Sequence, residues 1–302
     1  IMQRAAALVP ALTGGAADLN PSTKTYLKAE KDFTAENRAG RNIHFGVREL
    51  GMGFCTNGLA LSGCALPFCS TFTVFADYMK PALRLAAIQR LHAVFVFTHD
   101  SIFVGEDGPT HQPIEHLAML RGIPGMITIR PADSYETAHA WAAALQAAGP
   151  VAILLTRQNV PNLSPEMVAR IDVKRGAYVL RDAEAFDVLL IATGSEVIPA
   201  LQAADALAKD GTKARVVSMP SWELFEAQDA AYRESVLPAA CTRRITIEAA
   251  STFGWDRYAG PQGLKIGVDH FGDSAPYETL AEEYGLTAKG IVASAKAYLA
   301  RR

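Results

Sequence analysis

Glu49 is the first residue of the chain whose type and setting could do chemistry. It lies in the string GVRELGM at residues 46–52, where an apolar, helix-forming stretch begins, so we expect it at the start of a helix. A carboxyl there is stabilised by the positive end of the helix dipole and can serve in acid–base catalysis. The alternative is a purely structural glutamate at the start of a helix, paired with Arg48.

Two polar strings follow apolar runs that read as strands. THDS at residues 98–101 follows the run 93–97, and RQN at residues 157–159 follows the run 151–156. Ligands bind at the carboxyl ends of strands in open parallel sheets, so both strings are candidate site residues. The loop GEDGPTHQP at residues 105–113 adds two acids and a histidine between glycines and prolines, which indicates a shaped loop. A surface turn capped by Asp107 is the alternative.

Other chemistries fit the letters poorly. His111 and His116 are five residues apart, which would place them on different helix faces, so we expect no metal held by this chain alone. A GxSxG nucleophile elbow is absent. Gly194 stands at a strand-to-helix turn that could hold an anion, although Ser195 as a helix N-cap explains that string too. Phe72, Phe75 and Tyr78 are spaced by three, which predicts one helix face, either core or ring-binding.

The elements that must position these residues alternate between strand-like and helical patterns, which predicts crossover connections and mostly parallel sheets. We therefore expect an α/β fold with two consecutive doubly wound domains, at residues 1–160 and 176–302, joined by a proline-containing linker at 161–175. The predicted strands are 43–47, 65–69, 93–98, 126–130 and 151–156 in the first domain, and 188–193, 214–219, 245–248 and 265–268 in the second. The predicted helices are 72–91, 134–148, one from Ser195, and 288–299.

The bulk composition excludes some classes of partner. The net charge of -2 over 302 residues gives no general field for nucleic acid or an anionic membrane. No apolar run reaches 18 residues, so no membrane span is expected. The four cysteines form no CxxC pair and lie in apolar runs, where we expect them to act as small hydrophobes in a reduced, cytoplasmic protein. The initial isoleucine suggests that the true N-terminus precedes this sequence.

Six strings of the first half, in order, resemble transketolase: residues 14–19 (GGAADL), 46–52, 70–78, 98–101, 105–113 and 157–159. In the second half, residues 191–197 and 230–237 resemble its C-terminal domain. The resemblance covers nearly the whole chain. It implies the pyrimidine-binding domain followed by the C-terminal domain of a thiamine diphosphate enzyme that moves a two-carbon ketol unit from a ketose phosphate to an aldose phosphate.

The resemblance also implies residue roles. Glu49 would bond the aminopyrimidine ring and favour its imino tautomer, whose nitrogen takes the proton from the reactive thiazolium carbon. Phe75, with Phe72 and Tyr78, would pack on the pyrimidine, and Asp18 and Leu19 would line the ring site and the subunit contact. His99 and Asp107 would bind sugar hydroxyls, while His111, Ser22 and Arg157 would reach the phosphate.

The chain departs from the family at two positions and lacks one motif. Ala16 stands where serine is common, and Phe103 stands where glycine is frequent, which puts the shape of the substrate channel in doubt. No GDG motif with its asparagine ligand is present, so we expect the diphosphate and its Mg²⁺ or Ca²⁺ to need a missing N-terminal half.

The expected partners are therefore sugar phosphates and a second subunit or N-terminal half, with a homodimer as the expected assembly. A fragment and a split-enzyme subunit are both compatible with these letters. Deoxyxylulose phosphate synthase, a dehydrogenase β-subunit and a non-catalytic transketolase-like partner remain alternatives.

Overall fold

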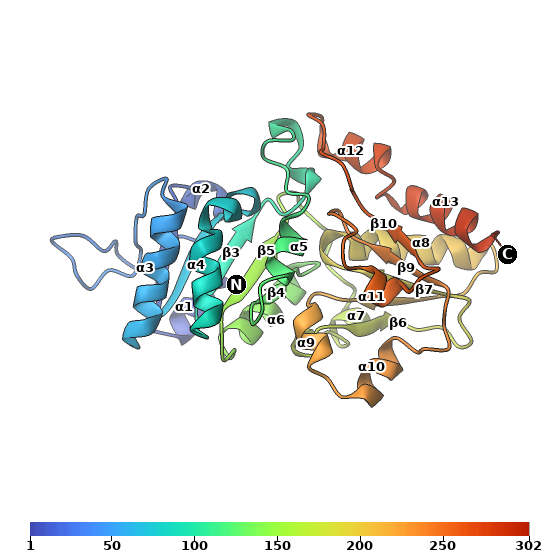
Figure 1. The fold of residues 1–302 in the computed structure, drawn as a ribbon, viewed down its shortest axis with the longest axis horizontal. Helices are drawn as coiled ribbons and strands as arrows, with labels where there is room; N and C mark the ends of the chain where they lie inside the picture. The colour runs from blue at the N-terminus through green and yellow to red at the C-terminus, as the bar shows by residue number, and fades with distance from the viewer. Residues whose placement is uncertain (302) are drawn as a thin grey trace.

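The computed structural model describes residues 1–301 and contains two five-stranded sheets that lie side by side (Figure 1). The first sheet is wholly parallel, in the order β1-β2-β3-β5-β4. The second has the order β10-β9-β7-β8-β6 and is parallel except for β6, which runs antiparallel to β8. The predicted α/β class with mostly parallel sheets is confirmed.

The first sheet and its helices form the left half of Figure 1. The strands are β1 (Leu12–Ala16), β2 (Leu66–Phe72), β3 (Val94–Thr98), β4 (Ile127–Ile129) and β5 (Val151–Leu155). The helices are α1 (Met2–Leu8), α2 (Asn20–Thr23), α3 (Glu49–Ser62), α4 (Ala76–Ile88), α5 (His116–Arg121) and α6 (Ser134–Ala144), with 3-10 turns η1 (Thr73–Phe75) and η2 (Ile102–Asp107).

The second half begins with the short helix α7 (Pro165–Val168), which lies within the predicted linker, and the turn η3 (Val173–Arg175). Its strands are β6 (Tyr178–Arg181), β7 (Val188–Ala192), β8 (Ala214–Ser218), β9 (Arg244–Ile247) and β10 (Leu264–Ile266). Its helical elements are η4 (Gly194–Glu196), α8 (Val197–Lys209), α9 (Trp222–Glu226), α10 (Ala230–Val236), α11 (Asp256–Ala259), α12 (Tyr277–Glu283) and α13 (Ala288–Leu299).

Strand β3 shows how the first sheet is buried on both faces. Phe95 and Phe97 belong to the apolar cluster under α3, α4 and α5, whereas Val94 and Val96 belong to the cluster with α1 and α6. The cluster that contains Val94 and Val96 continues without a break into the core of the other sheet. Alternating residues of one apolar strand therefore serve two layers of helices.

The predicted strand at 43–47 is wrong, and β1 was missed. Gly14 and Gly15 disfavour a strand by propensity, but a side chain at either position would meet backbone oxygen 1.8 Å from its Cβ, at Phe68 and Ile43 respectively. The chain at 41–43 passes along β1: the Gly14 amide donates to the Arg41 carbonyl and the Ile43 amide donates to the Gly14 carbonyl, but the segment does not continue as a strand. Glycine is thus present because the backbones approach closely.

The cysteine expectation holds for one residue of the four. Cys69 is buried, and burial raises the pKa of its thiol to about 12. Cys55 and Cys64 are exposed and Cys241 is half-buried, so the expectation of buried hydrophobes is wrong for these three; Cys55 lies in α3, and the other two lie in loops. All four are free thiols. Within residues 1–301, no helix has the length and apolar composition to cross a membrane.

The two sheets meet through buried polar contacts. Glu136 of α6 accepts hydrogen bonds from Ser218 (2.6 Å) and Tyr178 (2.5 Å) across the boundary. Arg121 of α5 donates two hydrogen bonds to Glu248, at 2.7 and 2.8 Å.

Two tryptophans of the second half surround that ion pair. The Arg121 guanidinium lies 4.0 Å from the centroid of the Trp222 ring and 5.5 Å from that of Trp255. Trp255 also donates a hydrogen bond of 2.7 Å to Glu248, and the two indole rings contact edge to face. A charged side chain of the first half is therefore enclosed by aromatic rings of the second.

Candidate functional site

The predicted site residues follow the strands of the first sheet in their spatial order. In the order β1-β2-β3-β5, the neighbouring strands end at Ala16, Phe72, Thr98 and Leu155. The candidates after these ends are Asp18, Leu19 and Ser22; Phe75 and Tyr78; His99, Asp107 and His111; and Arg157. The carboxyl ends of parallel strands share one edge, so the topology places these residues along one edge of the sheet.

The aromatic residues form a stacked series, but they do not lie on one helix. Phe72 ends β2, Phe75 ends η1 and Tyr78 lies in the first turn of α4, so the single-helix prediction is wrong. The ring centroids of Phe72 and Phe75 are 5.9 Å apart, and those of Phe75 and Tyr78 are 6.0 Å apart. Between Phe72 and Tyr78 the chain passes from a strand through a 3-10 turn into a helix. The three rings stay in contact along this path. Tyr78 is 64% exposed, which leaves a ring face free at the end of the series.

His99 joins this series from β3. Its imidazole stacks on Phe72 with centroids 3.7 Å apart, and its Nδ1 lies 2.9 Å from the Thr98 hydroxyl. Its backbone has a φ of 59°, a left-handed conformation that is unfavourable for a non-glycine residue. Burial lowers the pKa of His99 and the positive charge of Arg157 lowers it further, while Asp107 raises it. These influences show that Arg157 and Asp107 lie within electrostatic reach of the imidazole.

The loop at residues 105–113 brings His111 to the same place. The imidazole of His111 meets the Phe75 ring edge-on at 5.8 Å, and its Nδ1 lies 2.9 Å from the Thr110 hydroxyl. Gly105 and Gly108 both have positive φ, of 83° and 76°, which glycine adopts without strain. The glycine and proline punctuation therefore does produce a shaped loop.

The second half of the chain holds this loop from outside. Gln112 is buried and donates hydrogen bonds of 2.9 Å to the carbonyls of Gly105 and Asp273. Ser274 donates to the carbonyl of Glu106, and a side chain at Gly272 would come within 1.9 Å of the Gln112 amide oxygen. Gln112 lies within the GEDGPTHQP string, but its contact with the second half depends on tertiary structure and has no local sequence signal.

Phe103 packs at the boundary between the two halves of the chain. It is buried and meets the Tyr277 ring edge-on at 6.4 Å. It also lines a cavity of about 270 Å³ with Gln158, Pro161 and residues of α8 and α12. The bulky side chain thus packs at the contact between the two halves, and this accounts for a residue that sequence alone left as a doubtful channel position.

Glu49 is the first residue of α3, as predicted. Its side chain is buried, and within residues 1–301 it makes no hydrogen bond and no ion pair. Arg48 instead donates to the backbone carbonyl of Phe45 at 3.0 Å, so the expected structural pairing with Glu49 is not formed. The carboxylate is therefore largely enclosed but not sealed from solvent, which leaves it accessible to a ligand.

The residues after β1 lie beside a separate hollow. Asp18, with a left-handed φ of 62°, lines a cavity of about 670 Å³ together with Asn20, Lys24 and Gly46. Ser22 lies in α2 and is exposed. In the part of the chain that the structure describes, no hydrogen bond or ring contact joins Asp18, Leu19, Ser22 or Glu49 to the His99 group. The ring series, His99 and His111 are thus in direct contact, whereas these four share only the sheet edge.

One group of side chains has ligand atoms close enough for a metal. His116 is buried, with its Nε2 3.3 Å from Asp77 and its Nδ1 3.8 Å from Glu115, and both carboxylates are exposed. His116 begins α5 while His111 lies in the preceding loop, so the prediction that they occupy different faces of one helix does not apply. The two imidazole nitrogens face different carboxylates and neither makes a hydrogen bond within the described residues. We assign no metal to it.

Comparison with known families and proteins agrees over both halves. Residues 1–162 match the model "Transketolase, pyrimidine binding domain", and residues 176–287 match "Transketolase-like TK C-terminal domain". The chain is 52% identical to the transketolase of Halalkalibacterium halodurans over 294 residues, covering 96% of this chain and 44% of that protein. It is 50% identical to the transketolase of Geobacillus stearothermophilus, covering 100% of this chain and 46% of the relative. The chain therefore spans about half the length of the curated relatives it matches.

Solved structures show the same relation. The transketolase of Leishmania mexicana has a TM-score of 0.94 at 41% identity, covering 99% of this chain and 44% of that one. A split-gene transketolase, described as an inactive β4 tetramer, has a TM-score of 0.78 at 29% identity, covering 99% of this chain and 95% of that chain.

Proposed function

Because the chain belongs to the transketolase family, we propose that it supplies the ring-binding side of a thiamine diphosphate site that transfers two-carbon ketol units between sugar phosphates. The observation that carries this proposal is the largely enclosed carboxyl of Glu49 at the start of α3, which has no partner among residues 1–301, in a chain whose strand ends also bring together the aromatic series and His99. The cofactor, when bound, supplies the carbon nucleophile and the electron sink of the reaction.

The residues fit such a cofactor on two counts. Glu49 offers a carboxyl that would form a hydrogen bond with a ring nitrogen. That bond would favour one protonation state of an aminopyrimidine. Phe75 and Tyr78, partly exposed at the end of the stacked series, offer apolar faces to a planar ring. Asp18 and Leu19 would line the same ring site and a subunit contact.

On the substrate side, His99 and Asp107 would bind sugar hydroxyls close to the reacting carbon. Burial and Arg157 lower the pKa of His99, which favours a neutral imidazole able both to donate and to accept a hydrogen bond. Arg157, with His111 and Ser22, would bind the phosphate end, since a guanidinium fork matches phosphate oxygens.

The diphosphate and its divalent cation, Mg²⁺ or Ca²⁺, would be held by residues beyond those of this chain. The chain covers only 44–46% of its curated relatives, and the split-gene relative, which it covers almost fully, is inactive as a β4 tetramer. We therefore propose that a second polypeptide or further sequence completes the site. The free thiols also support a reducing, cytoplasmic setting.

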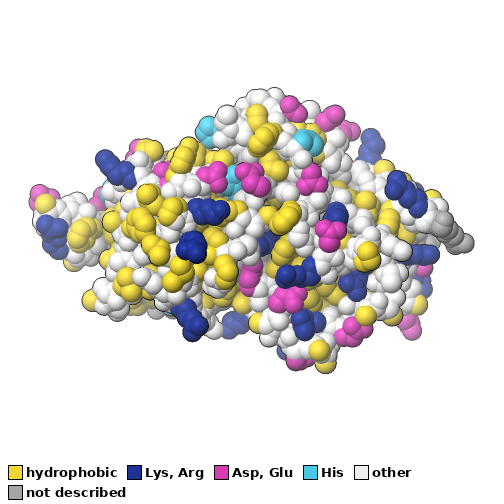
Figure 2. Space-filling view, in the orientation of Figure 1, with side chains coloured by type: hydrophobic (Ala, Val, Ile, Leu, Met, Phe, Trp, Pro, Cys, Tyr) yellow, Lys and Arg dark blue, Asp and Glu magenta, His cyan; other side chains and the backbone are white. Residues whose placement is uncertain are grey.

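A surface for that partner lies over α3 and α4. Figure 2 shows hydrophobic side chains gathered over these helices in the left half of the molecule. The exposed large residues there are Leu50, Phe54, Leu61, Tyr78, Leu85 and Ile88. An apolar patch of this kind marks an interaction site, and it supports an assembly such as a homodimer built on this face.

Calorimetric titration of the purified chain with thiamine diphosphate and magnesium tests this function. We expect weak or undetectable, metal-independent binding and no ketol transfer by the chain alone, with transfer restored when a diphosphate-binding half is supplied. Tight magnesium-dependent binding, or ketol transfer without a second polypeptide, would show that the chain holds the whole site. Binding restored without any ketol transfer would favour the non-catalytic partner.

A further inference from the structure

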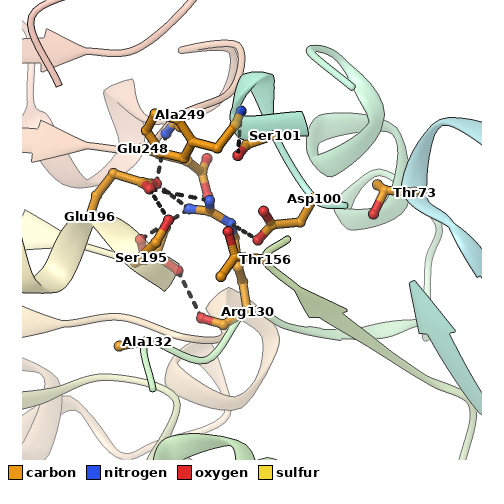
Figure 3. A network of polar contacts seen from close by, with 12 residues as sticks. Thr73, Asp100, Ser101, Arg130, Ala132, Thr156, Ser195, Glu196, Glu248 and Ala249 are labelled. Carbon is orange, nitrogen blue, oxygen red and sulfur yellow. Dashed lines mark hydrogen bonds and ion pairs between the residues drawn. The ribbon is translucent and has the colours of Figure 1, made fainter. Parts of the chain in front are cut away.

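A fully buried arginine links the two halves directly behind the site. Arg130 follows β4, and Figure 3 shows its guanidinium between Asp100 of the first half and Glu196 of the second. Its Nε donates to Asp100 at 2.8 Å, and its Nη1 donates to the Thr193 carbonyl at 3.0 Å and to Glu196. One planar fork therefore bonds both halves of the chain at once.

The second half is shaped to receive this guanidinium. Glu196 is held by the Ser195 hydroxyl at 2.6 Å and by the Ala249 amide at 2.8 Å. Gly194 has a φ of 60°, and a side chain there would meet the Arg130 guanidinium 2.5 Å from its Cβ. Ser195 is thus not a helix N-cap, and the turn at Gly194 receives a cation rather than an anion. Both readings of that string from the sequence were wrong.

Charge supports the same arrangement. Burial lowers the pKa of Arg130, but Asp100 and Glu196 more than offset this, so the arginine stays charged. Burial raises the pKa of Glu196 above its ordinary value and Arg130 opposes that rise only in part, so the contact between the two groups, rather than the titration of Glu196, identifies them as partners. Buried ion pairs of this kind add little net stability compared with apolar packing, so a role in fixing geometry is the better reason for their presence.

The geometry in question is that of His99. Its left-handed backbone persists only where the surroundings over-determine it. On the preceding side, the Thr98 carbonyl accepts a hydrogen bond of 3.0 Å from Thr73, and the ring stacks on Phe72. On the following side, the Asp100 carboxylate accepts a hydrogen bond of 2.8 Å from the Arg130 guanidinium.

We propose that Arg130 is a positioning residue for His99, acting through Asp100, with Glu196 of the second half as its counter-ion. The second half thereby sets the orientation of a site residue without contributing one of its own. The positioning itself stands on the contacts above, and only its kinetic consequence rests on the proposed function.

Two variants separate positioning from general loosening of the boundary. Arg130→Lys keeps the charge but replaces the planar fork, which donates to Asp100 and Glu196 from separate nitrogens, by a single ammonium. Arg121→Lys is the matched control, because Arg121 is also a buried arginine that pairs with a carboxylate across the same boundary but contacts no candidate site residue. The first readout is the NMR signal of the His99 imidazole in the full chain, which needs no cofactor or partner.

We expect Arg130→Lys to shift and broaden the His99 signals, and Arg121→Lys to leave them in place at a similar loss of melting temperature. In the completed enzyme, turnover should fall at least about tenfold for Arg130→Lys only, because misplacement of a site group lowers the rate steeply. Unchanged His99 signals in Arg130→Lys, or equal shifts in both variants, would overturn the proposal. If Arg130→Lys does not fold, Glu196→Gln, which keeps the arginine and the side-chain volume, decides by the same criteria.

The NMR signals and the turnover together separate the positioning of His99 by Arg130 from the role of His99 in ketol transfer. Shifted His99 signals with normal turnover would uphold positioning by Arg130 and refute the part given to His99 in ketol transfer. Lowered turnover with unmoved His99 signals would refute positioning.

Discussion

The imidazole of His99 stacks on the ring of Phe72, with centroids 3.7 Å apart and planes inclined by 25°. We expect Phe72→Leu to remove this stacking, which is worth roughly 1 kcal/mol beyond the area it buries, and to free the imidazole. The His99 proton signals should lose their ring-current shifts in NMR spectra. Phe95→Leu, a core change on β3, is the control that should lower stability without moving those signals.

Glu49→Gln should preserve the fold and lower turnover in the completed enzyme by at least about a hundredfold, the usual contribution of a positioned acid–base group. The amide keeps the volume of the side chain but loses the charge that would favour one proton state of the cofactor ring. Steady-state kinetics measure the loss. Glu278→Gln, an exposed glutamate in the first turn of α12, should have no effect, and near-normal turnover in Glu49→Gln would remove Glu49 from the mechanism.

Arg157→Ala should raise KM for phosphorylated sugars by the equivalent of about 1.5–3 kcal/mol, as expected for a lost bond to a charged group. Unphosphorylated substrates should be affected much less, since they offer no phosphate to the guanidinium. The comparison requires kinetics with a matched pair of sugars. Equal loss for both would indicate a structural role for Arg157.

The pH dependence of His99 follows from its lowered pKa. The folded chain releases the His99 proton at pH values where the unfolded chain, with the ordinary value of 6.5, still holds it. The unfolded state therefore binds more protons in that window, and His99 makes the free energy of unfolding fall as the pH drops below about 6.5.

NMR titration of the seven histidines should place His99 below 6.5, and Arg157→Met should move its pKa upward because a nearby positive charge is removed. Lys209→Met, on the exposed side of α8, should leave the titration unchanged. A downward move in Arg157→Met would contradict the electrostatic contact.

The sequence predicted the class of fold and most of the strands because apolar runs of buried parallel strands are local signals. β3 and β5 were placed to within a residue at each end. β1 was missed because its reason for being a strand, the close approach of Phe68 and Ile43 to two glycines, is not local. β6 was missed because an antiparallel edge strand carries only short alternation.

The candidate site was predictable to the same extent. Strand-end polar strings located His99 and Arg157, and helix-start chemistry located Glu49. The series from Phe72 to Tyr78 was recognised, yet its path through strand, 3-10 turn and helix was not. Nothing in the sequence indicated a role for Arg130, because an arginine at the end of a short strand is usually exposed to solvent. Only the tertiary structure shows it buried between two carboxylates.

The enclosure of Arg121 by Trp222 and Trp255 gives the chain a natural optical probe. These are two of the three tryptophans in the sequence, and both lie where the first half docks on the second. Separation of the halves would withdraw the guanidinium from the indole faces and admit water, shifting the emission to longer wavelength. Fluorescence of the unmodified chain can therefore follow domain docking in real time, without a dye and without turnover.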